Sequence, residues 1–202
     1  MARLVVFASG AGSTFKAILA AVQSRELEVE SIRLVTSRPD TGAEEIARGA
    51  NLDVRIFNPK DFLSAEIWDE AQAAQIREWQ PDLVVLAGYT LKLGPRTLGA
   101  AHGRVVNTHP ALLPKYGGLG MYGRRVHEAV LKNAEAESGV TVHWVTDEYD
   151  AGPIVAQEKV RVLPTDTPET LAERIKAIEK PFYTRIISSL LTRASEPQGA
   201  AK

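Results

Sequence analysis

The amino-acid sequence predicts an α/β fold built on a single doubly wound, mostly parallel sheet of the Rossmann-like kind. In the first half of the chain, short apolar runs alternate with stretches of helical length, which is the order of parallel strands joined by crossover helices. In the second half, two strand-like runs have little between them except an acidic loop, which predicts an antiparallel pair. The 202 residues, 45% of them hydrophobic, are sufficient for one core.

The elements of the first half are expected in strict alternation. The run from Leu4 to Ala8 is apolar throughout, as in a parallel strand that is covered on both faces. The third helix carries Trp68, Ala71, Ile76 and Trp79 within one broad arc, and Pro81 ends it. Strands are expected at residues 4–8, 32–36, 54–57 and 83–87, and helices at residues 13–24, 41–50 and 61–80.

The second half of the chain is expected to hold three strands. The short apolar run 104–106 reads as a buried strand that leads directly into Asn107. Residues 140–145 and 154–162 are expected to pair antiparallel around the acidic loop. The sequence therefore predicts a sheet that is parallel in its first part and antiparallel in its last.

A C-terminal helix is expected to complete the domain. It begins at Pro168, which follows the capping residue Thr167, and Pro181 should kink or restart it. We expect one domain at residues 1–193 and a disordered tail at residues 194–202, which lack apolar anchors. The core stripe of the helix consists of Leu171, Ile175, Ile178, Phe182, Ile186 and Leu190.

Composition narrows the class of protein. A formal net charge of -1 offers no basic surface for nucleic acid, and no apolar run approaches membrane-spanning length, so neither partner is expected. The absence of cysteine excludes disulfides and thiolate chemistry. No pair among the four histidines has convincing metal-ligand spacing, so we expect no metal. A cytoplasmic enzyme, either a monomer or a weak homodimer, is the expected form.

The segment from Asn107 to Pro114 is the most informative in the chain. In an extended strand, Asn107 and His109 project to one side and Thr108 to the other, and Pro110 favours extended geometry before it. An amide donor beside a titratable imidazole, where a strand leaves the sheet, suits a reaction that develops negative charge on a carbonyl oxygen. The alternative interpretation is a strand end with a polar cap.

An acidic loop at residues 146–153 could complete this pair. A carboxylate beside an imidazole raises the pKa of the imidazole and orients it, as a histidine that works as acid and base requires. The alternative is a solvated hairpin tip, because Gly152-Pro153 is a turn signal.

The glycine loop at residues 9–14 joins the first strand to the first helix. Its glycines and the helix N-terminus suit an oxyanion such as phosphate. The structural alternative, less favoured, is a tight strand-to-helix turn capped by Ser13. A second functional alternative is an NADP-dependent oxidoreductase, in which Ser37 and Arg38 would hold a ribose phosphate. Phe15 argues against the oxidoreductase, because this phenylalanine stands where the dinucleotide fingerprint has its third glycine.

These motifs resemble the folate-dependent formyltransferase family. The resemblance runs from the first strand to about Ile187, and the Asn-x-His-Pro-x-Leu-Leu-Pro signature at residues 107–114 is its most specific part. The phosphate loop and the chain length are most similar to the branch of purine synthesis. That branch implies 10-formyltetrahydrofolate as co-substrate, and the amine of glycinamide ribonucleotide as the group that attacks the formyl carbon.

The resemblance also implies a role for individual residues. Asn107 and His109 would stabilise the oxyanion of a tetrahedral intermediate, and Asp150 would keep His109 cationic and help to move the proton. The residues implied to bind the ribonucleotide are Gly12, Ser13, Thr14, Gly118, Lys176 and Glu179. Those implied to hold the folate are Thr90, Leu91, Lys92, Leu93, Asn107, Thr146 and Asp147.

The chain departs from the family pattern at four positions. The family commonly has asparagine at the position of Thr14, often has arginine at Leu91, and usually has histidine where Lys180 follows Glu179. Some relatives also have an arginine, near the glutamate tail of the cofactor, where this chain has Ala65. A salt link from position 91 is therefore in doubt. Lys176 and Glu179 could instead form an ordinary exposed pair on the last helix.

Three other functions stay open at this point. A formyltetrahydrofolate hydrolase would use the same triad, with water as the acceptor of the formyl group. Enzymes of that kind carry an extra N-terminal domain, which we do not expect here because the first predicted strand begins so early in the sequence. A transfer-RNA formyltransferase would carry a further C-terminal domain, and a non-catalytic nucleotide-binding module would not need the triad. The glycine-dense loop 117–123 is expected to be a mobile flap. We expect His127 to face a helix surface and His143 to have no catalytic partners.

Overall fold

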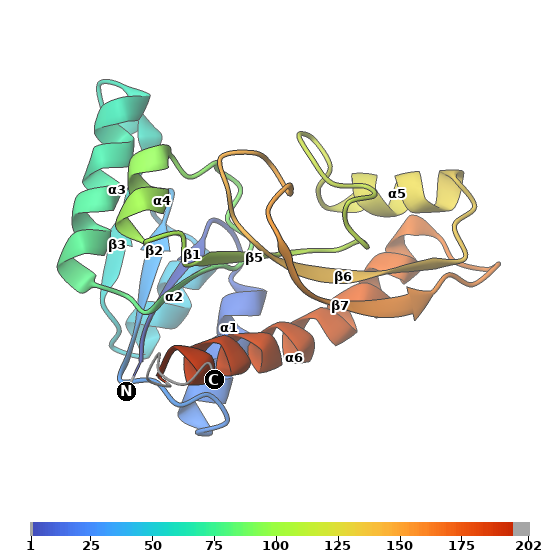
Figure 1. The fold of residues 1–202 in the computed structure, drawn as a ribbon, viewed down its shortest axis with the longest axis horizontal. Coiled ribbons are helices and arrows are strands. Elements are labelled where there is room, and N and C mark those ends of the chain that lie inside the picture. The colour runs from blue at the N-terminus through green and yellow to red at the C-terminus, as the bar shows by residue number, and fades with distance from the viewer. Residues whose placement is uncertain (1, 196–202) are drawn as a thin grey trace, which may run out of the picture.

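A seven-stranded sheet organises the computed structural model, which describes residues 2–195 (Figure 1). The strand order is β3-β2-β1-β4-β5-β6-β7, parallel from β3 to β5 and antiparallel at β6 and β7. The predicted fold class is therefore confirmed. The strands are β1 (Arg3–Ala8), β2 (Ser31–Thr36), β3 (Val54–Ile56), β4 (Leu83–Leu86), β5 (Val105–His109), β6 (Glu137–Trp144) and β7 (Ile154–Arg161).

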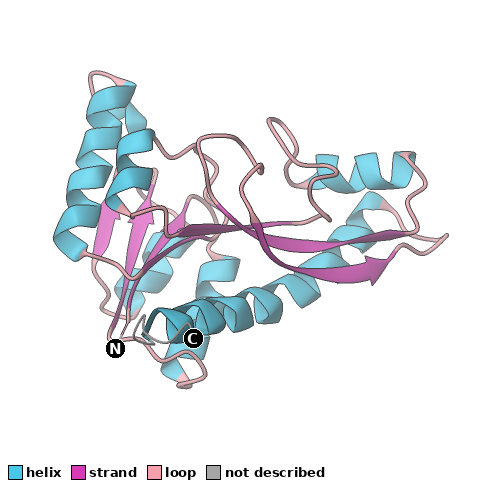
Figure 2. Ribbon diagram, viewed as in Figure 1, coloured by secondary structure: helices cyan, strands magenta, loops and turns pink. Residues whose placement is uncertain are grey.

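Within the described residues, five α-helices and one 3-10 turn lie between strands, and a sixth α-helix follows the last strand (Figure 2). The third helix begins four residues later than expected, because the Ser64 side chain accepts a hydrogen bond from the Ile67 N–H and caps it there. The helices are α1 (Ser13–Gln23), α2 (Gly42–Gly49), α3 (Ala65–Trp79), α4 (Pro95–Ala100), α5 (Arg124–Lys132) and α6 (Pro168–Ser195), and the turn is η1 (Pro59–Asp61).

Successive side chains of β1 enter two different cores. Leu4 and Val6 pack among residues of α1, α2 and α6, whereas Val5 and Phe7 pack with Ile76 and Trp79 of α3. In Figure 1, α3 and α4 accordingly cover one face of the sheet, and α1, α2 and α6 cover the other. Burial on both faces explains why the strand reads as an uninterrupted apolar run.

The C-terminal helix differs from the prediction at its middle and at its end. It continues through Pro181 without a restart, and the residues that follow the proline, Phe182 and Tyr183, are buried against the sheet. The Tyr183 hydroxyl lies 3.1 Å from the Leu86 carbonyl oxygen and 3.0 Å from that of Val106. These contacts hold the helix to β4 and β5 just after the proline, where a backbone hydrogen bond is lost.

The predicted tail begins inside this helix, since the helix reaches Ser195; the rest of it, residues 196–202, lies outside the described residues. Within residues 2–195, none of the helices combines the length and the apolar character that crossing a membrane would require.

Candidate active site

The carboxyl ends of β1, β4 and β5 lie at one edge of the sheet, and the candidate residues gather there. Asn107 and His109 project to the same side of β5, where they pair with His143 and Thr141 of β6. Thr108 points to the other side, toward the Glu179 carboxyl of α6. The alternation predicted from the sequence is confirmed.

Asp150 completes the constellation from the loop after β6. Its Oδ2 lies 3.5 Å from His109 Nδ1 and accepts a hydrogen bond of 3.0 Å from the Gly118 N–H. Its Oδ1 lies 3.5 Å from His143 Nε2. The side chain is only 12% exposed, so this carboxylate is not a solvated hairpin tip.

The protonation of His109 reflects two opposing effects. The residue is 4% exposed, and this burial lowers the pKa of its imidazole below the ordinary value of 6.5. Asp150 and the carbonyl oxygen of Tyr116, which lies 2.7 Å from Nε2, raise the pKa but do not cancel the effect of burial. The expectation that Asp150 keeps His109 cationic took account of one effect only: the carboxylate does raise this pKa, but burial, which the sequence could not show, is the larger effect and lowers it.

Asp150 itself stays ionised in this setting. Burial raises the pKa of its carboxyl, but the nearby imidazoles of His143 and His109 and the Gly118 N–H together hold the pKa below its ordinary value. A carboxylate that keeps its charge next to a buried imidazole is the arrangement needed to stabilise an imidazolium as it forms.

His143 is a member of the cluster that the sequence did not identify. It is 2% exposed, and its Nε2 lies 3.4 Å from Asn107 Nδ2. The expectation that His143 has no partners among the candidate catalytic residues is wrong. Its contact with Asn107 depends on the register of β5 against β6, which places the two residues opposite each other. No periodicity within either strand reveals that register.

A narrow cavity of about 80 Å³ opens beside the candidate catalytic cluster of Asn107, His109, His143 and Asp150, at the carboxyl end of β4. The Thr90 N–H anchors its rim by donating to Ser9 Oγ at 3.3 Å. Lys92 Nζ lies 5.5 Å from the centre of the Tyr149 ring, so this cation turns toward the acidic loop. The lining includes all the residues implied to hold folate except Asp147: it comprises Leu86, Tyr89, Thr90, Leu91, Lys92, Leu93, Asn107, His143, Val145, Thr146, Glu148, Tyr149 and Asp150.

A second cavity, of about 360 Å³, lies between β5, α5 and α6. Lys176 and Glu179 both line it, so they are not merely an exposed surface pair. Burial raises the pKa of the Glu179 carboxyl, while the nearby Thr108 hydroxyl and the Lys176 charge lower it. Thr108 Oγ1 is itself buried, and it lies close to this carboxyl without making a hydrogen bond of ordinary geometry in the described residues.

His127 lines the same cavity, which corrects the expectation that it faces a helix surface. It is 3% exposed, because α5 packs against α6 through this side of the helix. Burial lowers the pKa of its imidazole, and the charges of Lys176 and His109 lower it further. Its Nδ1 has no hydrogen-bond partner among the described residues.

The glycine loop lies at the carboxyl end of β1, the same edge as the catalytic cluster. Gly12 has φ of 75°, and a Cβ added to it would lie 2.6 Å from the Ala43 Cα, so glycine is required there by the packing of the protein itself. Ser13 is the exposed first residue of α1. Neither cavity described above includes Gly12, Ser13 or Thr14.

The residues on which the oxidoreductase alternative depends bind the protein itself. Ser37 is buried and donates from Oγ to Ser9 Oγ at 2.9 Å. Arg38 Nε donates to the Ser9 carbonyl oxygen at 3.4 Å. Both side chains therefore brace the glycine loop, which weakens their interpretation as ligands of a ribose phosphate.

The loop at residues 117–123 lies next to Asp150 at the candidate site. Gly118 approaches the catalytic cluster through its bond to Asp150, whereas Leu119 is 84% exposed and Tyr122 is 65% exposed. The Arg125 guanidinium stacks over the Tyr122 ring at 5.4 Å. The mobility of this flap stays a prediction.

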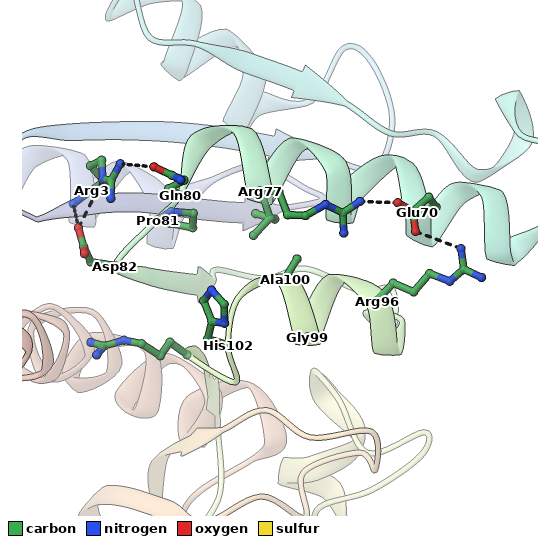
Figure 3. Close-up of a pocket in the computed structure, with 12 residues that line it drawn as sticks. Arg3, Glu70, Arg77, Gln80, Pro81, Asp82, Arg96, Gly99, Ala100 and His102 are labelled. Atoms are coloured by element: carbon green, nitrogen blue, oxygen red, sulfur yellow. Dashed lines mark hydrogen bonds and ion pairs between the residues drawn. The ribbon is translucent and has the colours of Figure 1, made fainter.

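A larger cavity, of about 1020 Å³, lies at the opposite edge of the sheet, before the start of β1, β4 and β5. Figure 3 shows two separate groups of paired side chains, one around Glu70 and one around Asp82. Arg77 and Arg96 both contact Glu70, and Arg3 pairs with Asp82 at 3.7 Å. The catalytic cluster lies at the other end of the strands, so this groove takes no part in the candidate site.

Within residues 2–195, histidine and carboxylate side chains form no group of three or more that could hold a metal ion.

Comparisons with known proteins agree with this geometry. The family model described as "Formyl transferase" matches residues 2–187. The phosphoribosylglycinamide formyltransferase of Bacillus subtilis is 32% identical over 191 residues, which cover 95% of both chains. The crystal structure of phosphoribosylglycinamide formyltransferase from Bacillus halodurans has a TM-score of 0.87 and 36% identity, covering 98% of this chain and 100% of that chain.

Two plant relatives are longer than this chain. The chloroplastic phosphoribosylglycinamide formyltransferase of Arabidopsis thaliana is 41% identical over 195 residues, which cover 93% of this chain and 65% of the relative. For the chloroplastic phosphoribosylglycinamide formyltransferase of Vigna unguiculata, the shared region covers 60% of the relative. The similarity therefore concerns the shared formyltransferase region.

Proposed function

Because this chain belongs to the formyl transferase family, we propose that it transfers the formyl group of 10-formyltetrahydrofolate to the amine of glycinamide ribonucleotide, a step of purine synthesis. The observation that carries the proposal is the buried contact of His109 with Asp150, next to Asn107 at the carboxyl end of β5. The relative from Bacillus subtilis, which this chain matches over 95% of its length, has that activity in its name.

The chemistry follows from the groups that surround His109. The amine attacks the formyl carbon and forms a carbon–nitrogen bond, and the carbonyl oxygen becomes an oxyanion that Asn107 and His109 stabilise. His109, neutral at first because burial lowers its pKa, takes up the proton of the attacking amine. It then gives that proton to the leaving folate nitrogen as the original carbon–nitrogen bond breaks. Asp150 stabilises the imidazolium that exists between these two transfers.

The free structure must change in two places to accept the substrates. The Nε2 of His109 faces the Tyr116 carbonyl oxygen, so a substrate atom has to replace that carbonyl. The cavity of about 80 Å³ beside β4 is smaller than the roughly 300–1,000 Å³ of most ligand sites. We propose that the folate enters there and displaces the acidic loop near Tyr149, which is 44% exposed.

The ribonucleotide is assigned to the other side of β5. The cavity that Lys176 and Glu179 line would hold its ribosyl part, since a carboxylate can accept hydrogen bonds from sugar hydroxyls. The N-terminus of α1 at Ser13 would hold its phosphate. We propose a cytoplasmic monomer or weak homodimer, although the names of the two plant relatives place those proteins in the chloroplast.

Acceptor dependence tests the proposed function against the hydrolase alternative. With formyl-folate and glycinamide ribonucleotide together, the protein should release deformylated folate, and it should release almost none when the ribonucleotide is omitted. The reason is that an amine held beside the formyl carbon outcompetes water by proximity. Absorbance of deformylated folate follows both reactions, with heat-inactivated protein as the control. Equal rates with and without ribonucleotide would establish the hydrolase instead.

The phosphate assignment is tested with Ser13→Ala. Loss of one hydroxyl contact should raise the KM for the ribonucleotide about three- to ten-fold and leave the KM for folate unchanged. Gly12→Val is unsuitable, because its side chain would collide with Ala43 and damage the fold. Ser24→Ala, at the far end of the same helix, is the matched control. A raised folate KM in Ser13→Ala would place the cofactor in this loop and revive the dinucleotide alternative.

A further inference from the structure

His143 lies within the polar cluster, although none of the steps above uses it. Its side chain is 2% exposed, and it stands on β6 opposite Asn107 of β5. Its Nδ1 lies 2.9 Å from the carbonyl oxygen of Trp144, and its Nε2 lies 3.4 Å from Asn107 Nδ2. A buried imidazole whose two nitrogens both have partners is held in one orientation.

These two contacts determine where the imidazole carries its proton. A carbonyl oxygen can only accept, so Nδ1 must donate to Trp144. In the neutral ring, Nε2 then has a free lone pair, which accepts one N–H of the Asn107 amide. The amide therefore presents its nitrogen to His143, and its second N–H is left for a substrate oxygen.

We propose that His143 is a positioning residue, which acts on the reaction through Asn107 by holding its amide so that one N–H faces the developing oxyanion. The inference rests on the proposed function, because only acyl transfer develops that oxyanion. A donor that is already oriented stabilises the transition state better than one that must turn during the reaction. The effect of His143 should therefore appear in kcat rather than in KM.

A competing role of the same nitrogen has to be separated from this one. His143 Nε2 also lies 3.5 Å from Asp150 Oδ1. If Nε2 carried a proton, it would donate to this carboxylate, and the Asn107 amide would have to present its oxygen instead. His143 would then act on the pair of Asp150 and His109 rather than on Asn107.

Two substitutions at His143 separate its Nε2 contact from its Nδ1 contact, because the two new side chains differ in length. In His143→Gln, the amide oxygen can occupy the position of Nε2 and still accept from Asn107, whereas the shorter side chain of His143→Asn reaches only the position of Nδ1. We expect His143→Asn to lower kcat about ten-fold, as the loss of one oriented hydrogen bond predicts, and His143→Gln to stay within about three-fold of the wild type. The KM values for both substrates should hardly change in either variant.

The double variant tests whether the effect passes through Asn107. In an Asn107→Ala background, His143→Asn should change kcat very little, because the amide that it positions is already gone. Independent, additive losses in the double variant would overturn the proposal. So would equal losses in His143→Gln and His143→Asn, or a wild-type kcat in His143→Asn.

A spectroscopic measurement makes the proposal testable without activity. In protein labelled with 15N-histidine, the ring signals of one histidine should show a protonated Nδ1 and an unprotonated Nε2 at neutral pH, and these signals should disappear in His143→Gln. A protonated Nε2 on His143 would overturn the proposal, even if the variants fold poorly. Failure of the wild-type protein to transfer formyl groups would refute the proposed function, but it would leave this tautomer assignment intact.

Discussion

Replacing Asp150 with asparagine is expected to lower kcat by about 10²–10⁴-fold, the usual contribution of a positioned proton-transfer group. The substitution removes the charge that stabilises the imidazolium of His109, while burial continues to disfavour it. The fold should survive. Asparagine can still accept the Gly118 N–H, and it tolerates the left-handed backbone of this position, where φ is 54°.

The His109 titration gives this prediction an independent measurement. In the wild type, Asp150 raises the pKa of His109 against the larger effect of burial, so Asp150→Asn should lower that pKa further. The proposed reaction starts from the neutral imidazole, which exists above its pKa, so activity is lost as the pH falls through that pKa. A lower pKa therefore moves this loss of activity at acid pH to a lower pH. NMR titration of the imidazole and the pH profile of kcat check both statements.

Asp40→Asn is the matched control, because Asp40 is exposed and has the same left-handed backbone as Asp150, with φ of 56°. It should leave kcat and the titration of His109 unchanged. A near-normal kcat in Asp150→Asn, together with an unmoved titration, would remove Asp150 from the mechanism.

The parts of the site that the sequence predicted are those that depend on local geometry. Asn107 and His109 share one side of β5 because side chains alternate along any strand, and no tertiary information is needed to see this. Their place at the carboxyl edge follows from the βαβ order that the apolar runs revealed. Asp150 needed the family resemblance, since a charge cluster in a turn has no periodicity that distinguishes a ligand from a solvated tip.

The parts that the sequence could not supply depend on how distant segments pack. His143 faces Asn107 only through the register of β5 and β6. His127 is buried because α6 lies against α5, and a short helix does not reveal which of its faces will be covered. Pro181 stays inside one helix because Tyr183 binds two strands of the sheet. In each case a tertiary contact overrides or completes a local preference.

For the pKa of His109, the sequence argument predicted correctly that Asp150 raises it, but it did not predict that burial has the larger effect. The consequence is mechanistic. A histidine that is neutral in the free protein can accept the proton of the attacking amine, which a permanently cationic one could not.

Asn107→Ala is the second substitution with a large expected effect: it should lower kcat by about 10²–10³-fold, as the loss of one oxyanion donor does in acyl transfer. The amide contacts the oxygen only weakly in the ground state, when that oxygen is a neutral carbonyl. The dissociation constant for folate should therefore change much less than kcat. Single-turnover kinetics measure the chemical step, and a fluorescence titration measures folate binding.

Asn107→Asp separates the donor role from mere occupancy of space. Its carboxylate has nearly the same shape, but it accepts hydrogen bonds only and places a negative charge beside the developing oxyanion. We expect its kcat to be at least as low as that of Asn107→Ala. Asn58→Ala, at the start of the 3-10 turn η1, serves as the unrelated control. If Asn107→Asp kept most of the wild-type kcat, the oxyanion could not lie at this amide, and stabilisation of the intermediate would have to come from His109 alone.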